Sequence, residues 1–444
     1  MSSRWIDIPF SPRKSPFFYG WVILAFSTLG TLASVPGQTM GVGVFTDPLI
    51  EAFSLSRIQL AYAYALGTIT SAFMLPLAGR LIDIHGCRAA IVYSGVGFGI
   101  CLYFMAVADR MLAASPFHGF AAAFLVATVA FLGVRFFGQG CLTMVSRVMI
   151  GKWFNHFRGR ATAIAGLFIS FGFTNAPFLL HAIVVEQGWR FALYSLAVST
   201  GLLMAAFGWI FYRDNPQECG LVPDGVDDPE WHEKMSARTP DVRHEFERGE
   251  ALRTAAFWAP TLALSLHGLQ FTAFTFHTTD MGVELGLPAD NVYRLFLLLP
   301  WFSVPANFVC GWLADYIKLK WFLVLMLLCQ VIGTYGLSIA GTPMGWFLFS
   351  AGYGISGGIF AIMITLPWPR FFGTRHLGAI SGLNMSMMVF ASAFGPILYS
   401  IVHDYAGAYR PIIHASAFVP AFIAVLAYFA ENPQERYPEP DPQA

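Results

Sequence analysis

The sequence predicts an all-α membrane protein with twelve transmembrane helices, arranged as two parallel six-helix repeats. Its 444 residues are 56% hydrophobic and 12% charged, whereas an average soluble domain is about 25% charged. Apolar runs of about 20 residues, long enough to span a bilayer as helices, recur along the whole chain. The sequence Asn-Pro-Gln-Glu follows two of these runs, at residues 215–218 and 432–435. These observations indicate a duplicated bundle of membrane helices.

The apolar runs place the expected spans. They lie near residues 18–42, 57–79, 89–108, 119–146, 161–185, 190–212, 255–279, 292–314, 321–341, 344–366, 377–402 and 410–430. Their length and their lack of two-residue alternation favour helices over a β-barrel. The only extended polar stretch separates the sixth span from the seventh. We therefore expect an N-terminal half at 1–212, a cytoplasmic linker at 213–253, and a C-terminal half with a short tail at 254–444.

Basic residues predict the orientation. If the N-terminus is cytoplasmic, most of the 26 Lys and Arg residues fall on the cytoplasmic side, as the positive-inside rule requires. We expect a multi-pass protein of a bacterial inner (plasma) membrane, with both termini cytoplasmic, in contact with the bilayer and monomeric. The six cysteines show no metal-binding spacing, and no basic patch is interleaved with aromatic residues. The sequence predicts no metal, no cofactor and no nucleic-acid partner.

Further pairs of segments support the duplication. GRLIDIHGCRAAI at 79–91 corresponds to GWLADYIKLKWFL at 311–323, and FNHFRGRATAIAG at 154–166 corresponds to RFFGTRHLGAISG at 370–382. Each pair occupies the same place relative to the spans of its half. Parallel repeats of this kind are the arrangement found in the two halves of major facilitator transporters.

At these residues the chain resembles the major facilitator superfamily over nearly its whole length. The family's loop signature after the second span stands here as Gly79, Asp83, Gly86 and Arg88, although Ile84 and Cys87 replace residues that are commonly basic. The resemblance implies a gate that latches the cytoplasmic side in the outward-open state. The candidate gate residues are Gly79, Asp83, Gly86, Arg88, Arg158, Gly311 and Asp315. A loop that only fixes topology is the alternative.

Within the superfamily, three stretches look like the monocarboxylate and oxalate/formate exchanger branch. They are FYGW at 18–21, KWFNHFRGRATAIAG at 152–166 and RDNPQECGLVPDG at 213–225. That branch often carries an arginine in span eight or a lysine in span eleven to hold a carboxylate. The segments 295–311 and 377–402 contain neither, so a monocarboxylate substrate rests on the resemblance alone.

Arg135 is the main candidate for substrate binding. It lies near the middle of span four, where an ionised side chain is costly unless it faces a partner or a wet cavity. The alternative is an arginine that bonds helix carbonyls and Gln139 for packing. Gln38 follows Pro36 and Gly37 in span one, and broken first helices commonly line transporter sites.

Span seven and three asparagines supply the other candidates. His267 and Gln270 are three residues apart and share a helix face, and His277 lies nearer the outer end. His267 is the most central histidine, so it is our candidate for proton coupling, with hydrogen-bonded packing as the alternative. Asn175, Asn307 and Asn384 could bond either a substrate or a neighbouring helix.

We therefore predict a secondary active transporter that moves a small organic, monocarboxylate-like anion by alternating access. Transport would be proton-linked or by exchange, so the expected partners are the substrate and, for proton-linked transport, protons. The alternative is an efflux carrier for an amphipathic or aromatic compound, since 43 residues are Phe. No Walker A sequence supports ATP-driven transport, and no nucleophile and base set supports an enzyme. A receptor on a carrier fold would need a soluble signalling domain, and the linker is too short and polar to be one.

Overall fold

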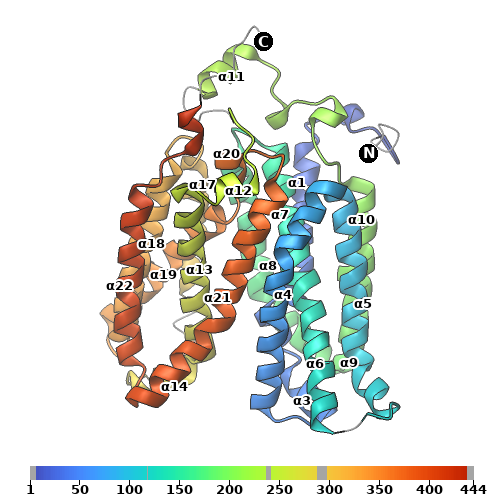
Figure 1. Cartoon of the computed structure of the whole chain (residues 1–444), viewed down its shortest axis with the longest axis vertical. Helices are drawn as coiled ribbons and strands as arrows, with labels where there is room; N and C mark the ends of the chain where they lie inside the picture. Colours follow the sequence, from blue (N-terminus) through green and yellow to red (C-terminus); the bar gives the residue numbers. More distant parts are fainter. Residues whose placement is uncertain (1–6, 118, 237–241, 288–297, 438–444) are drawn as a thin grey trace. The chain divides into compact units, whose positions relative to one another are not determined.

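The computed structural model describes residues 7–117, 119–236, 242–287 and 298–437, which form helices and the turns that connect them (Figure 1). Ten helices in this described part are long and apolar enough to span a membrane. The chain divides into two compact units. Unit 1 comprises Met1–Trp153, Phe168–Gly225 and Gly378–Ser386, and unit 2 comprises Phe154–Leu167, Val226–Leu377 and Met387–Ala444.

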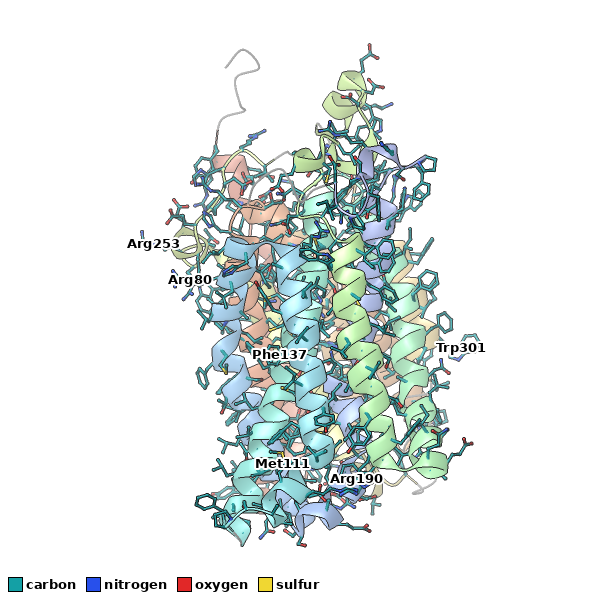
Figure 2. All side chains as sticks on the ribbon, turned by 90° about the vertical axis from the view of Figure 1, so that its right-hand side faces the viewer. Arg80, Met111, Phe137, Arg190, Arg253 and Trp301 are labelled. Carbon is teal, nitrogen blue, oxygen red and sulfur yellow. The ribbon has the colours of Figure 1, made fainter. Side chains whose placement is uncertain are left out.

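Unit 1 contains the first six predicted spans. Its helices are α1 (Gly20–Ala33), α2 (Thr39–Gly43), α3 (Thr46–Phe53), α4 (Arg57–His85), α5 (Cys87–Ala113), α6 (Phe120–Val134), α7 (Thr143–Trp153), most of α8 (Arg158–Gln187), α9 (Trp189–Leu196) and α10 (Leu203–Phe211). Short 3-10 turns η2 (Pro12–Lys14), η3 (Val35–Gly37), η6 (Gln217–Cys219) and η7 (Pro223–Gly225) complete it. Arg80 of α4 and Arg190 of α9 lie at opposite ends of the helix bundle of unit 1 in Figure 2. The apolar parts of the helices lie between these two charged ends.

Unit 2 contains the linker helices and the later spans. Its helices are α11 (Pro229–Ser236), α12 (Arg248–Ala251), α13 (Ala255–Phe276), α14 (Thr278–Glu284), α17 (Leu299–Leu313), α18 (Leu319–Ser338), α19 (Pro343–Met363), α20 (Pro367–Phe372), most of α21 (Leu377–Ala406) and α22 (Arg410–Tyr428), followed by η8 (Pro433–Arg436). α18 packs against both α19 and α22, and Figure 1 shows these helices side by side. Trp301 of α17 is 78% exposed and projects outward in Figure 2, as a lipid-facing ring would.

The predicted spans coincide with helices throughout the described residues. Spans 255–279 and 292–314 correspond to α13 and α17, which are not among the ten helices that are long and apolar enough to span a membrane. Residues 292–297 lie outside the described part. The prediction of an all-helical membrane protein is thus confirmed. The arrangement as two six-helix repeats, with boundaries at 212 and 253, stays a prediction.

Among the described residues, three spans depart from a continuous α-helix well inside their length. The first is interrupted by η3 between α1 and α2, and the fourth and sixth contain π-helical turns, η4 (Arg135–Leu142) and η5 (Ala197–Leu202). A π turn inserts one residue into the helical repeat and is frequent at functional sites. Two of the three interruptions involve the segments that carry Gln38 and Arg135.

The first Asn-Pro-Gln-Glu motif is preceded by Asp214, which caps α5. Its Oδ1 accepts the backbone N–H of Arg88 at 2.9 Å. Gly86, just before the helix, has φ +83°, and a Cβ added there would lie 2.4 Å from Asp214 Oδ2. Only glycine fits both the backbone angle and the capping carboxylate.

The second motif holds the linker through the buried side chain of Gln434. Its Oε1 accepts the backbone N–H groups of Arg243 and His244, each at 2.9 Å. Its Nε2 donates to the carbonyls of His244 and Phe371, each at 2.9 Å. In front of this motif, Glu431 pairs with Lys320 at the start of α18. In both copies, residues in or just before the motif thus tie the end of the last helix to neighbouring segments.

We expect Gln434→Ala to lower the melting temperature of the purified protein, because the change leaves buried backbone groups of the linker without partners. An unsatisfied buried group costs roughly 1–3 kcal/mol. Gln217, the corresponding residue of the first motif, is exposed, so Gln217→Ala is the matched control and should melt like the wild type. Equal melting of both variants would contradict this role of Gln434.

Candidate functional site

The candidate site in unit 1 is built around Arg135, which begins the π turn η4. Its side chain is only 2% exposed, and Nη1 donates to the carbonyl of Gly37 at 2.9 Å. The guanidinium carbon lies 5.2 Å from the ring centroid of Tyr64 on α4, within cation–π range. Arg135 therefore joins the interruption of the first span to α4.

Gly37 allows this approach because it has no side chain. A Cβ at Gly37 would lie 2.7 Å from the Val134 carbonyl and 2.8 Å from the backbone nitrogen of Gln139, closer than real contacts allow. The broken first span can therefore abut η4 directly. Beside it, half-buried Gln38 donates from Nε2 to Ser34 Oγ at 3.0 Å.

Two buried polar atoms at this position have no hydrogen-bond partner among the described residues. They are Nε of Arg135, a donor, and Oε1 of Gln139, an acceptor. Most buried polar groups in proteins are hydrogen-bonded, so exceptions call for a bound ligand, water or another explanation. A guanidinium with a free donor is the group that binds carboxylates most specifically. The structure thus brings Arg135, Gln139 and Gln38 to one helix interruption, as a binding site requires.

The sequence did not single out Tyr64 and Thr39 as members of this cluster. Thr39 Oγ1 lies 2.9 Å from the Tyr64 hydroxyl, and the Tyr64 ring faces Arg135. A tyrosine in an aromatic-rich membrane helix carries no distinguishing signal. Only the packing of α4 against the first and fourth spans reveals it.

In unit 2, His267 lies in a second polar cluster on α13. Its Nδ1 is 2.8 Å from Gln330 Nε2, an amide donor, and 3.2 Å from Ser356 Oγ. An Nδ1 that carries no proton would accept from this amide. The ring stacks on Phe360 with centroids 4.7 Å apart. Oε1 of Gln330 is buried without a partner among the described residues. This cluster therefore also contains one unpaired hydrogen-bond acceptor.

Gln270 and His277 are held by the protein itself. Gln270 is fully buried: Nε2 donates to the Ser416 carbonyl at 2.8 Å, and Oε1 accepts from the Tyr353 hydroxyl at 2.8 Å. His277 Nδ1 lies 3.1 Å from the Tyr409 hydroxyl and Nε2 lies 3.0 Å from the Pro396 carbonyl. These contacts join α13 and the residue that follows it to neighbouring segments, which is a packing role.

The three asparagines occupy different environments. Asn307 is 4% exposed and Nδ2 donates to the Gly358 carbonyl at 3.2 Å, whereas exposed Asn175 donates to Phe171 of its own helix at 2.8 Å. Asn384 is 2% exposed and its Oδ1 has no partner among the described residues. Asn384 thus keeps an unused acceptor, while Asn307 bonds a neighbouring helix.

The first candidate gate forms around Asp83 in unit 1. Its two carboxylate oxygens accept the backbone N–H groups of Gly378 and Ala379, each at 2.7 Å, at the start of α21. A carboxylate is stabilised at this position by unpaired N–H groups and by the helix dipole. A Cβ at Gly79 would lie 2.1 Å from the Gly378 carbonyl, so glycine is required for the approach. The gate expected from the resemblance therefore has a defined partner.

The second candidate gate forms around Asp315 in unit 2. Its carboxylate accepts the N–H of Gly159 at 2.8 Å and that of Arg160 at 3.2 Å, at the start of α8. Arg370 Nη2 and Arg160 Nε lie 3.7 Å and 3.6 Å from its oxygens. Asp315 is fully buried. A Cβ at Gly311 would lie 2.5 Å from Ala163 Cβ, which repeats the Gly79 arrangement.

Two further gate candidates lie at helix starts. Arg88 donates from Nε to the Trp209 carbonyl at 2.8 Å and from Nη2 to the Ile8 carbonyl at 2.5 Å. It therefore joins α5 to the end of α10 and to the N-terminal segment. Arg158 is 5% exposed and begins α8, next to Gly159 of the second gate.

Asp315 also predicts a pH dependence. Burial raises the pKa of its carboxyl from 3.8 to about 6, against the opposing effects of Arg370 and the two N–H groups. Between about pH 4 and 6 the folded chain binds this proton more tightly than the unfolded chain, so stability falls as pH rises through this window and then levels. We expect Asp315→Asn to lose this part of the pH dependence in melting curves. Exposed Asp227→Asn is the control; a wild-type profile in Asp315→Asn would refute the assignment.

Comparison with known proteins is consistent with this architecture. The family model described as Major Facilitator Superfamily matches residues 29–370 and 261–444. Monocarboxylate transporter 11 of Mus musculus is 23% identical over 407 residues, covering 88% of this chain and 82% of its own length. The Homo sapiens protein of the same name is 22% identical over 401 residues, covering 88% and 78%.

Solved structures agree at the level of the fold. The proton:xylose symporter XylE superposes with a TM-score of 0.69 at 14% identity, covering 93% of this chain and 96% of its own. The human organic anion transporter MFSD10 superposes with a TM-score of 0.61 at 15% identity, covering 93% and 100%. The relatives are membrane transporters and not enzymes, as the sequence predicted, and they include mammalian proteins, so a bacterial membrane stays a prediction. This chain is an integral, multi-pass membrane protein that belongs to the Major Facilitator Superfamily.

Proposed function

We propose that this transporter moves a small organic anion of the monocarboxylate class, and that Arg135 binds its carboxylate. The observation that carries the proposal is that one π turn, Arg135–Leu142, holds two buried atoms without a partner among the described residues, the Nε donor of Arg135 and the Oε1 acceptor of Gln139. A carboxylate oxygen would accept from Nε, and a hydroxyl or a protonated carboxyl of the same molecule would donate to Oε1. A 2-hydroxy or 2-oxo acid carries its second oxygen next to the carboxylate and suits such a pair.

The names of the relatives point to the same chemistry. The curated relatives are monocarboxylate transporters, and one structure of similar fold is an organic anion transporter. The monocarboxylate branch often carries a basic residue in span eight or span eleven. In this chain the corresponding segments, 295–311 and 377–402, contain no Lys or Arg. Arg135 would take over the task of holding the carboxylate.

The two aspartate gates supply the conformational step of the proposal. Asp83 binds the start of α21, and Asp315 binds the start of α8. In each gate, the aspartate comes from one half of the sequence and the helix start from the other. Release of both carboxylates would free these helix starts, which is the movement that alternating access requires. Proton linkage would act through His267 or through protonation of the substrate itself.

Uptake into proteoliposomes tests the proposal. The full chain is reconstituted and offered labelled lactate, pyruvate, formate and oxalate, with and without an inward proton gradient, beside a neutral sugar and a hydrophobic cation. We expect saturable uptake of at least one monocarboxylate and counterflow by unlabelled acid. Acceleration by the gradient would identify proton linkage. Transport of the hydrophobic cation with no uptake of any acid would refute the proposal and favour the efflux alternative.

A further inference from the structure

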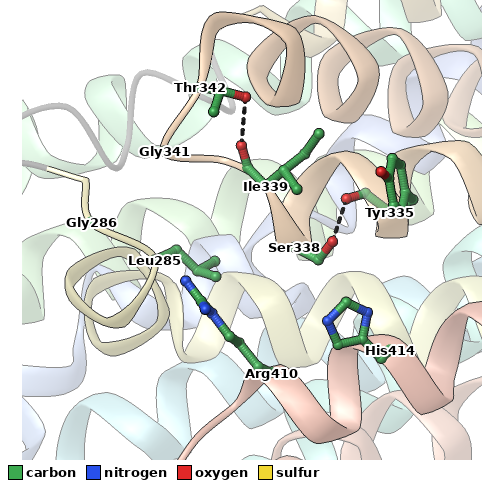
Figure 3. A pocket seen from close by; sticks show the side chains of 9 residues that line it. All are labelled: Leu285, Gly286, Tyr335, Ser338, Ile339, Gly341, Thr342, Arg410 and His414. Atoms are coloured by element: carbon green, nitrogen blue, oxygen red, sulfur yellow. Dashed lines mark hydrogen bonds between the residues drawn. The ribbon is translucent and has the colours of Figure 1, made fainter.

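A cavity of about 690 Å³ lies at one end of unit 2, and its lining includes no residue of either candidate site (Figure 3). It is bounded by the end of α18, the turn that leads to α19, the start of α22, and Leu285 and Gly286 after α14. Its volume is within the range of sites that hold small molecules, about 300–1,000 Å³. We propose that this cavity binds the phosphate of an anionic membrane lipid.

The position of the cavity corresponds to the headgroup level of a bilayer. α18 begins at Leu319, beside Lys318 and Lys320, which pair with Glu435 and Glu431. It ends at Ser338, which lines the cavity. Twenty helical residues cover about 30 Å, the thickness of the hydrocarbon core. The charged lysine end and the cavity therefore lie at opposite boundaries of the membrane.

The side chains of Arg410 and His414 give the cavity its cationic character. They are four residues apart on α22, so they share one helix face, and both are exposed. Figure 3 shows both side chains directed from α22 toward the turn between α18 and α19. Within the described part of the chain, Arg410 forms no side-chain ion pair. The nearby Glu284 accepts the backbone N–H groups of Tyr409 and Arg410, at 2.6 Å and 3.1 Å, and so caps α22.

Two hydroxyl groups of the lining, those of Ser338 and Thr342, already donate within the protein. Ser338 Oγ donates to the Tyr335 carbonyl at 2.7 Å, and Thr342 Oγ1 donates to the Ile339 carbonyl at 2.9 Å, as drawn in Figure 3. Arg410 offers a planar set of N–H donors and His414 offers a ring N–H. Guanidinium groups bind phosphate through paired, charge-assisted hydrogen bonds.

Two apolar stripes lead away from the cavity and favour a lipid over a soluble phosphate. On α22, Phe418, Phe422 and Val425 follow His414 at helical spacing and are 75%, 76% and 59% exposed. On α18, Ile332 and Leu328 continue the face of Tyr335 and are 45% and 47% exposed. The two helices pack against each other. A phosphate held at Arg410 would place its acyl chains along these stripes, whereas a free phosphate would not use them.

Lipid binding to the purified full chain in detergent tests this inference independently of transport. Native mass spectrometry would measure the apparent affinity for phosphatidylglycerol and for phosphatidylcholine, with inorganic phosphate as competitor. We expect phosphatidylglycerol to bind more tightly than phosphatidylcholine, and Arg410→Gln to weaken it about tenfold. His414→Leu should weaken it less, because only the guanidinium is permanently charged.

Arg110→Gln is the matched control, since Arg110 is an exposed arginine at the end of α5 in unit 1 and does not line the cavity. Its affinity should equal that of the wild type. Equal affinity in Arg410→Gln and the wild type, or equal affinity for both lipids, would overturn the inference. Competition by inorganic phosphate as strong, mole for mole, as that by phosphatidylglycerol would assign the cavity to a soluble anion and overturn the lipid assignment. Transport results leave each of these outcomes unchanged.

Discussion

Replacing Arg135 by alanine is expected to lower the uptake of a transported monocarboxylate by about 30-fold or more, because truncation of a buried, charged hydrogen-bonding partner costs roughly 2–5 kcal/mol. Arg135→Lys keeps the charge and should retain only part of the activity, because an ammonium lacks the fixed, planar donor geometry of the guanidinium. Initial uptake rates in proteoliposomes at equal reconstituted protein measure both effects.

The control for this prediction is Arg110→Ala, which removes an exposed arginine from the end of α5. Its uptake should match the wild type. A thermal-shift titration with the transported acid separates binding from movement. If Arg135→Ala binds the acid with wild-type affinity, the residue is a packing element that holds Gly37, and the proposed anion site is wrong.

The second large effect is expected at the gates. Asp83→Asn keeps the size of the side chain but loses the charge, and only one of its two polar atoms can accept from the N–H groups of Gly378 and Ala379. Hydrogen bonds to charged groups contribute about 1.5–3 kcal/mol, so we expect uptake to slow by roughly tenfold. The folded yield should change little, because the change leaves the packed apolar side chains in place.

Asp315→Asn tests the other gate. The segment of Asp315 has no counterpart of Gly86, since Lys318 stands there. The fully buried carboxylate, with two N–H donors and two nearby arginines, nevertheless leads us to expect an effect at least as large as that of Asp83→Asn. Asp227→Asn, in the exposed linker, is the control. Uptake equal to the wild type in both gate variants would show that these carboxylate contacts do not contribute to transport.

The sequence predicted the helices well because each needs only a run of apolar residues as long as the bilayer is thick. It also placed Asp83 and Asp315 at helix ends, since spacing alone locates them. Their partners could not be predicted. Gly378 and Gly159 contribute backbone N–H groups. Every residue except proline carries such a group, so the residue type does not indicate which one binds the carboxylate.

The candidate sites show the same limit. Arg135 was recognisable because a charge in an apolar run is costly, whereas Tyr64 was hidden among many aromatic residues. Hydropathy could not show that Gln270 is saturated by the Ser416 carbonyl and the Tyr353 hydroxyl, while Gln139 keeps a free acceptor. That distinction depends on side chains from other helices. The π turn at Arg135 was also invisible, because one inserted residue does not change an apolar run.

The pairing of each gate aspartate with a distant helix start has a consequence for biosynthesis. The partner of Asp83 is made 295 residues later, and Asp315 must bind a helix start made 156 residues earlier. At about 5–20 residues per second, the ribosome needs about 15–60 s to pass from Asp83 to α21. Asp83 must remain a hydrated carboxylate at the membrane surface during that time. The last third of the chain therefore decides when the first third acquires its final contacts, and a nascent chain truncated before α21 would leave Asp83 without these two helix-start contacts.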